Sequence, residues 1–249
     1  MVEMTQEDRA SRETLVQWLR KNSPQVSVGL LAADAMAYGA AIKSLEEAGV
    51  ALLHFDVMDG VFCPLMTAGA GLVKAADTTM LKDVHLMVSD PLTQIPAHLL
   101  AGADIVHVHA EGMTHLHRAL VALDVPVAPS DKNGNPSGRK VIRSVALNPA
   151  TPVQYLKPVL GKLEMVTFVA VDPGWGGGGP DKALASKIAD LRAMAQEQNV
   201  DPLIAIDGGI NARTYPVARD MGAHIIVSGS AVFAAGSSIA SNLEKLSGL

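Results

Sequence analysis

Short apolar runs alternate with segments of helical period along most of the chain, and this alternation restricts the fold more than any other sequence feature. The apolar runs lie at roughly 26–31, 51–57, 82–87, 104–109, 142–147, 164–171, 203–206 and 224–228. The helical segments lie at about 37–48, 68–77, 92–101, 113–122, 152–160, 182–198, 212–221 and 231–246. Such β-then-α units favour a closed (β/α)8 TIM barrel of the α/β class, although an open doubly wound sheet would show the same alternation. The length of 249 residues matches one barrel, which predicts a single domain over 1–249.

An additional helix is predicted before the first strand, over 5–21, inside an N-terminal helical extension that spans 1–24. Thr5 is a suitable cap for this helix. Apolar side chains recur at helical spacing at Leu15, Trp18 and Leu19. We expect this helix to cover one end of the barrel.

The polar, turn-rich stretch Pro129–Lys140 interrupts the alternation between the fourth helix and the fifth strand. A connection of this kind lies on the N-terminal face of a barrel, opposite the usual active site. We therefore interpret it as a solvated loop or a minor contact in an oligomer.

The balance of charge and the cysteine content exclude several classes of protein. The chain has 20 Lys and Arg against 25 Asp and Glu, which gives a net charge of −5. This acidic balance does not indicate a nucleic-acid-binding protein, which typically has an excess of basic residues. No apolar run is long enough to span a membrane, and Met1–Gln25 lacks the apolar core of a signal peptide. Cys63 is the only cysteine, so no internal disulfide can form. These features predict a soluble, cytoplasmic protein.

Polar residues follow most of the predicted strands at their C-terminal ends, where the active sites of such barrels collect. Each residue alone also suits a turn or a satisfied core position. Their recurrence at the same end of successive strands indicates a site. The residues are His54, Asp56, Asp59, His85, His109, Glu111, Asn148, Asp172, Asp207 and Ser228.

His54, Asp56, His85 and Asp207 together form a plausible nitrogen and oxygen ligand set for Zn²⁺, Mn²⁺ or Fe²⁺. His54 and Asp56 are two residues apart, so they project from the same face of a strand. From this strand alone, two polar side chains in the core that hydrogen-bond to each other would explain the pattern equally well. Asp56 and Asp207 would approach a substrate carbon from opposite sides of the barrel mouth, an arrangement that serves proton removal and return.

Glycines after the last three strands indicate a phosphate site. They occur in Gly174–Gly179, in Gly208-Gly209 and at Gly229-Ser230, which we expect to open the last helix. Backbone N–H groups and a helix N-terminus could converge there on an anion. One glycine-rich run would equally suit a mobile loop, but three on successive strands favour phosphate. The phosphate-binding candidates are Gly176, Gly177, Gly208, Gly209, Gly229 and Ser230.

Seven motifs follow one another in unbroken order: His-Phe-Asp-Val-Met-Asp-Gly (54–60), Asp-Val-His-Leu-Met-Val (83–88), Ala-Gly-Ala-Asp-Ile (101–105), Leu-Asn-Pro-Ala-Thr-Pro (147–152), Val-Asp-Pro-Gly-Trp-Gly-Gly (171–177), Asp-Gly-Gly-Ile (207–210) and Gly-Ser-Ala-Val-Phe (229–233). On these motifs the sequence resembles the ribulose-phosphate 3-epimerase family over about residues 26–236. The resemblance implies a barrel with one divalent metal ion, such as Zn, Fe(II), Mn or Co. The reaction it implies is inversion of C3 of D-ribulose 5-phosphate to give D-xylulose 5-phosphate through an enediolate.

Residue roles follow from the same resemblance, position by position. It implies that His54, Asp56, His85 and Asp207 bind the metal ion, and that Asp56 and Asp207 also form the acid/base pair. Met58 and Met87 would line the site around the intermediate, whereas core packing explains each methionine equally well. The phosphate would be held by Gly177, Gly209, Gly229 and Ser230.

The chain departs from the family pattern where the substrate is contacted. Gly29 stands where the family has a substrate-binding serine in the motif that opens strand one, unless Ser27 replaces it. Val169 stands in place of a third methionine, and the lid reads Trp175-Gly176-Gly177-Gly178. These changes leave room for a related phosphoketose such as D-allulose 6-phosphate.

Two other interpretations stay open at this point. Decarboxylases and aldolases of phosphate-binding barrels resemble one another in an Asp-x-Lys-x-x-Asp signature, but the comparable Asp56-Val57-Met58-Asp59 has no lysine. A non-catalytic sugar-phosphate-binding barrel is the other alternative. For any of the three, a homo-oligomer is expected, since such barrels commonly associate.

Overall fold

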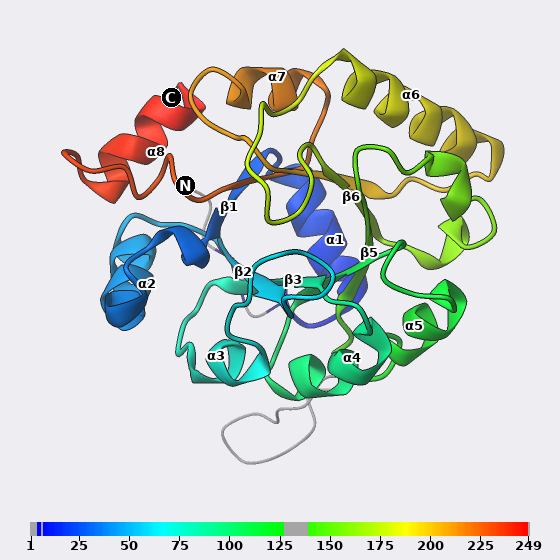
Figure 1. Cartoon of the computed structure of the whole chain (residues 1–249), viewed down its shortest axis with the longest axis horizontal. Helices are drawn as coiled ribbons and strands as arrows, with labels where there is room; N and C mark the ends of the chain where they lie inside the picture. Colours follow the sequence, from blue (N-terminus) through cyan, green and yellow to red (C-terminus); the bar gives the residue numbers. More distant parts are fainter. Residues whose placement is uncertain (1–3, 6, 127–138, 249) are drawn as a thin grey trace.

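Eight parallel strands close into a barrel in chain order, with the first strand paired to the last (Figure 1). The computed structural model describes residues 4–5, 7–126 and 139–248. The strands are β1 (Gln25–Gly29), β2 (Leu52–Met58), β3 (Leu81–Met87), β4 (Ile105–His109), β5 (Ile142–Leu147), β6 (Met165–Val169), β7 (Leu203–Asp207) and β8 (Ile225–Ser228). The predicted TIM barrel is thus confirmed, and the open sheet is wrong. The loop predicted over 129–140 lies outside the described residues, apart from its last two positions.

Helices form a ring around the strands (Figure 1). They are α2 (Tyr38–Glu47), α3 (Ala70–Ala75), α4 (Pro91–Leu100), α5 (Leu116–Ala122), α6 (Lys182–Glu197), α7 (Tyr215–Asp220) and α8 (Ile239–Ser247). The helix predicted over 152–160 is instead two 3₁₀ turns, Val153–Leu156 and Leu160–Lys162. Pro158 explains the difference, because proline in a helix interior removes a backbone donor and clashes with the preceding turn.

The last helix begins at Ile239, after a Ser238 cap, and not at Gly229 as predicted. Gly229 accepts backbone hydrogen bonds from Val232 and Phe233 and closes a tight turn. Gly236 then takes a φ of +87°, a left-handed conformation that interrupts helical progress. The expected helix N-terminus at Gly229-Ser230 is therefore wrong. A hydrogen-bonded turn over residues 229–233 stands in its place.

The predicted N-terminal helix is confirmed as α1, although it spans only Arg12–Lys21. Ser11 caps it by accepting a hydrogen bond from the N–H of Thr14, whereas Thr5 bonds to Asp8 ahead of the helix. The helix closes the end of the barrel where the strands begin. Its buried Leu15, Trp18 and Leu19 share one apolar cluster with Leu52, Leu81, Ile105, Ile142, Met165 and Leu203.

Polar side chains fill the barrel above this apolar layer. Their hydrogen bonds join strands that are not neighbours, such as Ser27 of β1 to Asp83 of β3 and His107 of β4 to Thr167 of β6. Only side chains that point into the barrel can make such bonds. The interior is thus apolar where the strands begin and polar toward their C-terminal ends. No helix in the described residues is long and apolar enough to cross a membrane.

Candidate active site

The four predicted metal ligands converge at the C-terminal end of the barrel. The ligand atoms of His54, Asp56, His85 and Asp207 all lie within 4.8 Å of one another. The parallel register places Asp56 of β2 beside His85 of β3, and closure of the barrel brings in Asp207 from the end of β7. Nδ1 of His85 lies 3.1 Å from Oδ2 of Asp207.

His54 is oriented toward this cluster by its second ring nitrogen. Nδ1 of His54 lies 2.8 Å from Oδ2 of Asp83, while Nε2 lies 3.5 Å from Asp56 and 3.9 Å from Asp207. This Nε2 atom is buried and has no hydrogen-bond partner among the described residues. Burial disfavours the charged imidazole, but the carboxylates of Asp83 and Asp56 raise the pKa of His54 well above its usual range. A buried nitrogen that lacks a partner and faces two carboxylates fits a bound divalent metal ion.

Asp207 is suited to remain ionised in this cluster. Burial favours the neutral carboxyl, but the hydrogen bond with His85 and the imidazole of His54 lower the pKa of Asp207. A carboxylate in this state can bind a cation and can also accept a proton.

Asp83 anchors a buried network that the sequence reasoning missed. Its carboxylate is fully buried and accepts hydrogen bonds from the Ser27 hydroxyl at 2.6 Å, from His54 and from Nε2 of His107. Burial opposes ionisation, but His107 and His54 hold the pKa of Asp83 well below its usual range. Asp83 lies two residues before His85, so the alternation of a strand could have placed both inside the barrel. Because Ser27 bonds to Asp83, its hydroxyl does not replace the serine missing at Gly29.

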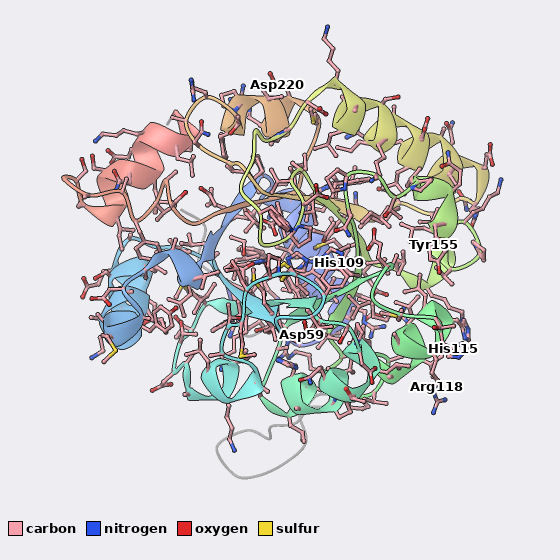
Figure 2. All side chains as sticks on the ribbon, in the orientation of Figure 1. Asp59, His109, His115, Arg118, Tyr155 and Asp220 are labelled. Carbon is pink, nitrogen blue, oxygen red and sulfur yellow. The ribbon has the colours of Figure 1, made fainter. Side chains whose placement is uncertain are left out.

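A second chain of hydrogen bonds supports His85. Nε2 of His85 lies 2.9 Å from Nε2 of His109, and Nδ1 of His109 lies 3.1 Å from Glu111. Figure 2 labels His109 near the centre of the barrel. Burial lowers the pKa of His109 to about 4, so its ring is neutral at neutral pH. Burial opposes ionisation of Glu111, but the bonds from His109 and Thr151 lower the pKa of Glu111 to about 2. The chain therefore ends on a carboxylate, an arrangement that orients metal-binding histidines.

A cavity of about 400 Å³ extends from Asp56 and Asp207 to the glycine-rich turns. Five of the predicted phosphate-binding residues line it, namely Gly177, Gly208, Gly209, Gly229 and Ser230. Gly209 has a φ of +66°, and a Cβ there would lie 2.6 Å from Cα of Gly179, so only glycine fits. Gly176 does not line the cavity.

The two predicted methionines lie in a separate cluster at the barrel mouth. Met58 and Met87 are buried with Cys63 and pack against Phe62. Burial raises the pKa of the Cys63 thiol, in keeping with a packed, unreactive side chain.

Two polar residues at the strand ends make hydrogen bonds that stabilise the neighbouring loops. Asp59 accepts hydrogen bonds from the backbone of Val61 and Phe62 and from Ser89, which holds the loop after β2. Ser228 is buried and donates to the carbonyl of Ile210. Their position at the correct end of the barrel therefore did not distinguish these residues from metal ligands.

The fold and the cluster together match one family of known proteins. The profile of the "Ribulose-phosphate 3 epimerase family" matches residues 25–233. The chain belongs to the ribulose-phosphate 3-epimerase family. Within it, the chain is 40% identical over 212 residues to a ribulose-phosphate 3-epimerase of Bacillus subtilis, covering 84% of this chain and 92% of that protein. It is 36% identical over 208 residues to the putative epimerase LsrE of Salmonella typhimurium, covering 84% and 80%.

More distant solved structures share only the barrel with this epimerase-family chain. A structure described as KGPDC from Streptococcus mutans superposes with a TM-score of 0.60 at 14% identity, over 90% of this chain and 97% of that one. At that identity the likeness establishes the fold alone. Membership of the ribulose-phosphate 3-epimerase family, by contrast, makes the chain an isomerase of the epimerase class.

Proposed function

We propose that this epimerase inverts C3 of a ketose phosphate, converting D-ribulose 5-phosphate to D-xylulose 5-phosphate, with one divalent metal ion. The observation that carries the proposal is the convergence of His54, His85, Asp56 and Asp207 beside a cavity rimmed by glycine turns. The family relationship supports the same reaction class.

The two imidazoles and two carboxylates would hold Zn²⁺, Fe²⁺, Mn²⁺ or Co²⁺. Such an ion, when bound, supplies positive charge beside the substrate oxygens that become negative as C3 loses its proton. Asp83 holds Nδ1 of His54, so that Nε2 faces the cluster. The chain through His109 and Glu111 orients His85 in the same way.

Asp56 and Asp207 move the protons. They belong to β2 and β7, which are not neighbours in the barrel, so they flank the cavity from different sides. One carboxylate removes the C3 proton, and the other returns a proton to the opposite face, which inverts the configuration. The lowered pKa of Asp207 keeps this group ready to accept a proton at neutral pH.

Backbone groups bind the phosphate. The turns at Gly177, Gly208-Gly209 and Gly229-Ser230 line the cavity. Because glycine has no side chain, an anion can approach the backbone N–H groups of these turns closely. Met58 and Met87 border the mouth through their cluster with Phe62 and Cys63. In this role their polarisable sulfurs would face the carbon skeleton of the substrate.

The test is exchange of the C3 proton with D₂O in metal-reconstituted protein supplied with D-ribulose 5-phosphate. We predict that Asp207→Asn retains the fold and abolishes exchange. The amide cannot accept the proton, and the change also removes a ligand of the metal ion that exchange through either carboxylate needs. The matched control is Asp190→Asn, an exposed aspartate on α6, which should exchange at the wild-type rate. Full exchange in Asp207→Asn would refute the role of this residue. A wild-type protein that binds the sugar phosphate without exchange would instead be a non-catalytic binder.

Three expectations about the whole protein stay predictions. They are a single domain over 1–249, a homo-oligomer and a cytoplasmic location. Sedimentation equilibrium of the purified chain would test the second of these.

A further inference from the structure

A second cavity, the basal pocket, lies at the end of the barrel where the strands begin, opposite the proposed active site. Its volume is about 730 Å³, within the range of about 300 to 1,000 Å³ that small-molecule sites occupy. The pocket lies between the segment before α1, the ends of α3 and α4, and the starts of β3, β4 and β5. The side chains that matter here are Arg9, Lys74, Lys82, Leu100, Asp104 and Arg139.

Positive charge dominates the basal pocket, although the whole chain has a net charge of −5. Asp104 is its one acidic side chain, and this carboxylate is already paired with Arg139 and accepts a hydrogen bond from the backbone N–H of Lys82. Across the part of the chain that the structure describes, Arg9, Lys74 and Lys82 form no ion pair. Three cations therefore border one cavity without a carboxylate bound to any of them.

Two of these cations repel each other across the pocket. Nζ of Lys82 is held in place by the carbonyl of Val73 at 2.7 Å, and this lysine is half-buried. Burial lowers the pKa of Lys82, and the guanidinium of Arg9 lowers it further, whereas Asp104 and Asp77 raise it. Like charges held this close destabilise each other, and an anion bound between them removes that repulsion.

The N-terminal extension supplies one of the three cations. Residues 25–233 match the family profile, so Arg9 lies outside the part of the chain that the family shares. Arg9 donates a hydrogen bond to the carbonyl of Thr79, just before β3, and its Nε lies 3.3 Å from the sulfur of Met4. The extension thus does more than close the barrel, because it also fixes a guanidinium at the rim of the basal pocket.

We propose that the basal pocket binds an organic bisphosphate, a compound with two phosphate groups on one carbon skeleton. Guanidinium and ammonium groups bind phosphate oxygens through charge-assisted hydrogen bonds. One phosphate monoester carries a charge of about −1.5 to −2 at pH 7, so two carry about −3 to −4 and match three cations better than one does. Leu100, which is 63% exposed at the rim, offers apolar contact to the carbon skeleton.

The test is isothermal titration calorimetry of the metal-loaded protein with D-glucose 1,6-bisphosphate and, for comparison, with D-glucose 6-phosphate. We expect the bisphosphate to bind at least about 10-fold more tightly, because only its second phosphate reaches the remaining cation. Arg9→Gln and Lys74→Gln should each weaken binding of the bisphosphate by about 10- to 100-fold, the effect of losing one hydrogen bond between charged groups.

Two matched controls lie outside the basal pocket. Arg20→Gln removes another arginine of the N-terminal extension, and Lys43→Gln removes an exposed lysine of α2. Both should bind the bisphosphate as the wild type does. Lys74 is itself exposed, so Lys74→Gln provides a folded variant even if Arg9→Gln disturbs the extension.

Three results would each overturn the inference. They are no measurable binding of the bisphosphate to the wild type, equal losses in the pocket variants and the controls, and displacement of the bisphosphate by D-ribulose 5-phosphate, which would place it at the active site. The inference is independent of the proposed function. Arg9→Gln and Lys74→Gln should keep the wild-type kcat/KM for D-ribulose 5-phosphate, since the basal pocket and the active site lie at opposite ends of the barrel.

Discussion

Replacement of Asp83 by asparagine tests whether the buried network positions the proposed metal ligands. Asp83 accepts hydrogen bonds from His54, His107 and Ser27, and it is fully buried. An asparagine offers one acceptor oxygen, and its NH₂ group would face a hydrogen-bond donor. Nδ1–H of His54 or Nε2–H of His107 would then lose its acceptor, and Nε2 of His54 would no longer be held toward Asp56.

The expected magnitude follows from the role of such carboxylates. Loss of a carboxylate that orients a metal-binding histidine lowers metal affinity by about 10- to 100-fold, or roughly 1.4 to 2.8 kcal/mol. Because Asp83 also raises the pKa of His54, protons compete with the ion for Nε2. Affinities are therefore compared at about pH 8.5, where that competition is weaker.

The assay is competition for Zn²⁺ or Mn²⁺ between the protein and a chromogenic chelator, with circular dichroism to check the fold. Asp104→Asn is the matched control, since Asp104 is also a buried aspartate but precedes β4 at the opposite end of the barrel, where it pairs with Arg139. We expect unchanged metal affinity in this control. A folded Asp83→Asn protein with wild-type affinity would refute the reasoning.

Two further predictions concern stability. Burial lowers the pKa of His98 below the value of about 6.5 expected in the unfolded chain. The neutral buried ring therefore stabilises the folded state fully above about pH 6.5, and this stabilisation is lost as the pH falls toward the folded-state pKa. His98→Leu should reduce the fall in unfolding free energy between about pH 7.5 and about pH 5.5, as measured with urea; an identical fall would contradict this. Arg12→Ala should lower the free energy of unfolding by about 1 to 3 kcal/mol, because the Val141 carbonyl and Asp124 lose their buried donor. The partly exposed Arg20, which pairs with exposed Asp201, is the control, and Arg20→Ala should lower it by at most about 1 kcal/mol. Equal losses in urea unfolding would rule out a special role for Arg12.

Local sequence patterns were sufficient to predict the barrel and to identify the metal-ligand candidates. Strand positions follow from apolar runs, and ends of parallel strands must meet at one rim, so His54, Asp56, His85 and Asp207 could be grouped without coordinates. Local chemistry also explains where the prediction was wrong. Pro158 breaks the helix expected over 152–160, and Gly236 delays the start of α8.

Tertiary structure alone decided which polar groups touch across the barrel. Asp83, His107 and Thr167 come from three different strands, and their hydrogen bonds depend on closure, tilt and side-chain direction, which no stretch of sequence encodes by itself. The same holds for the cavity, where Asp56, Asp207 and Gly229 come together only because β7, β8, β1 and β2 lie side by side. Hydrophobic periodicity along the chain therefore predicts the barrel. The distances between side chains of different strands determine what the barrel can bind.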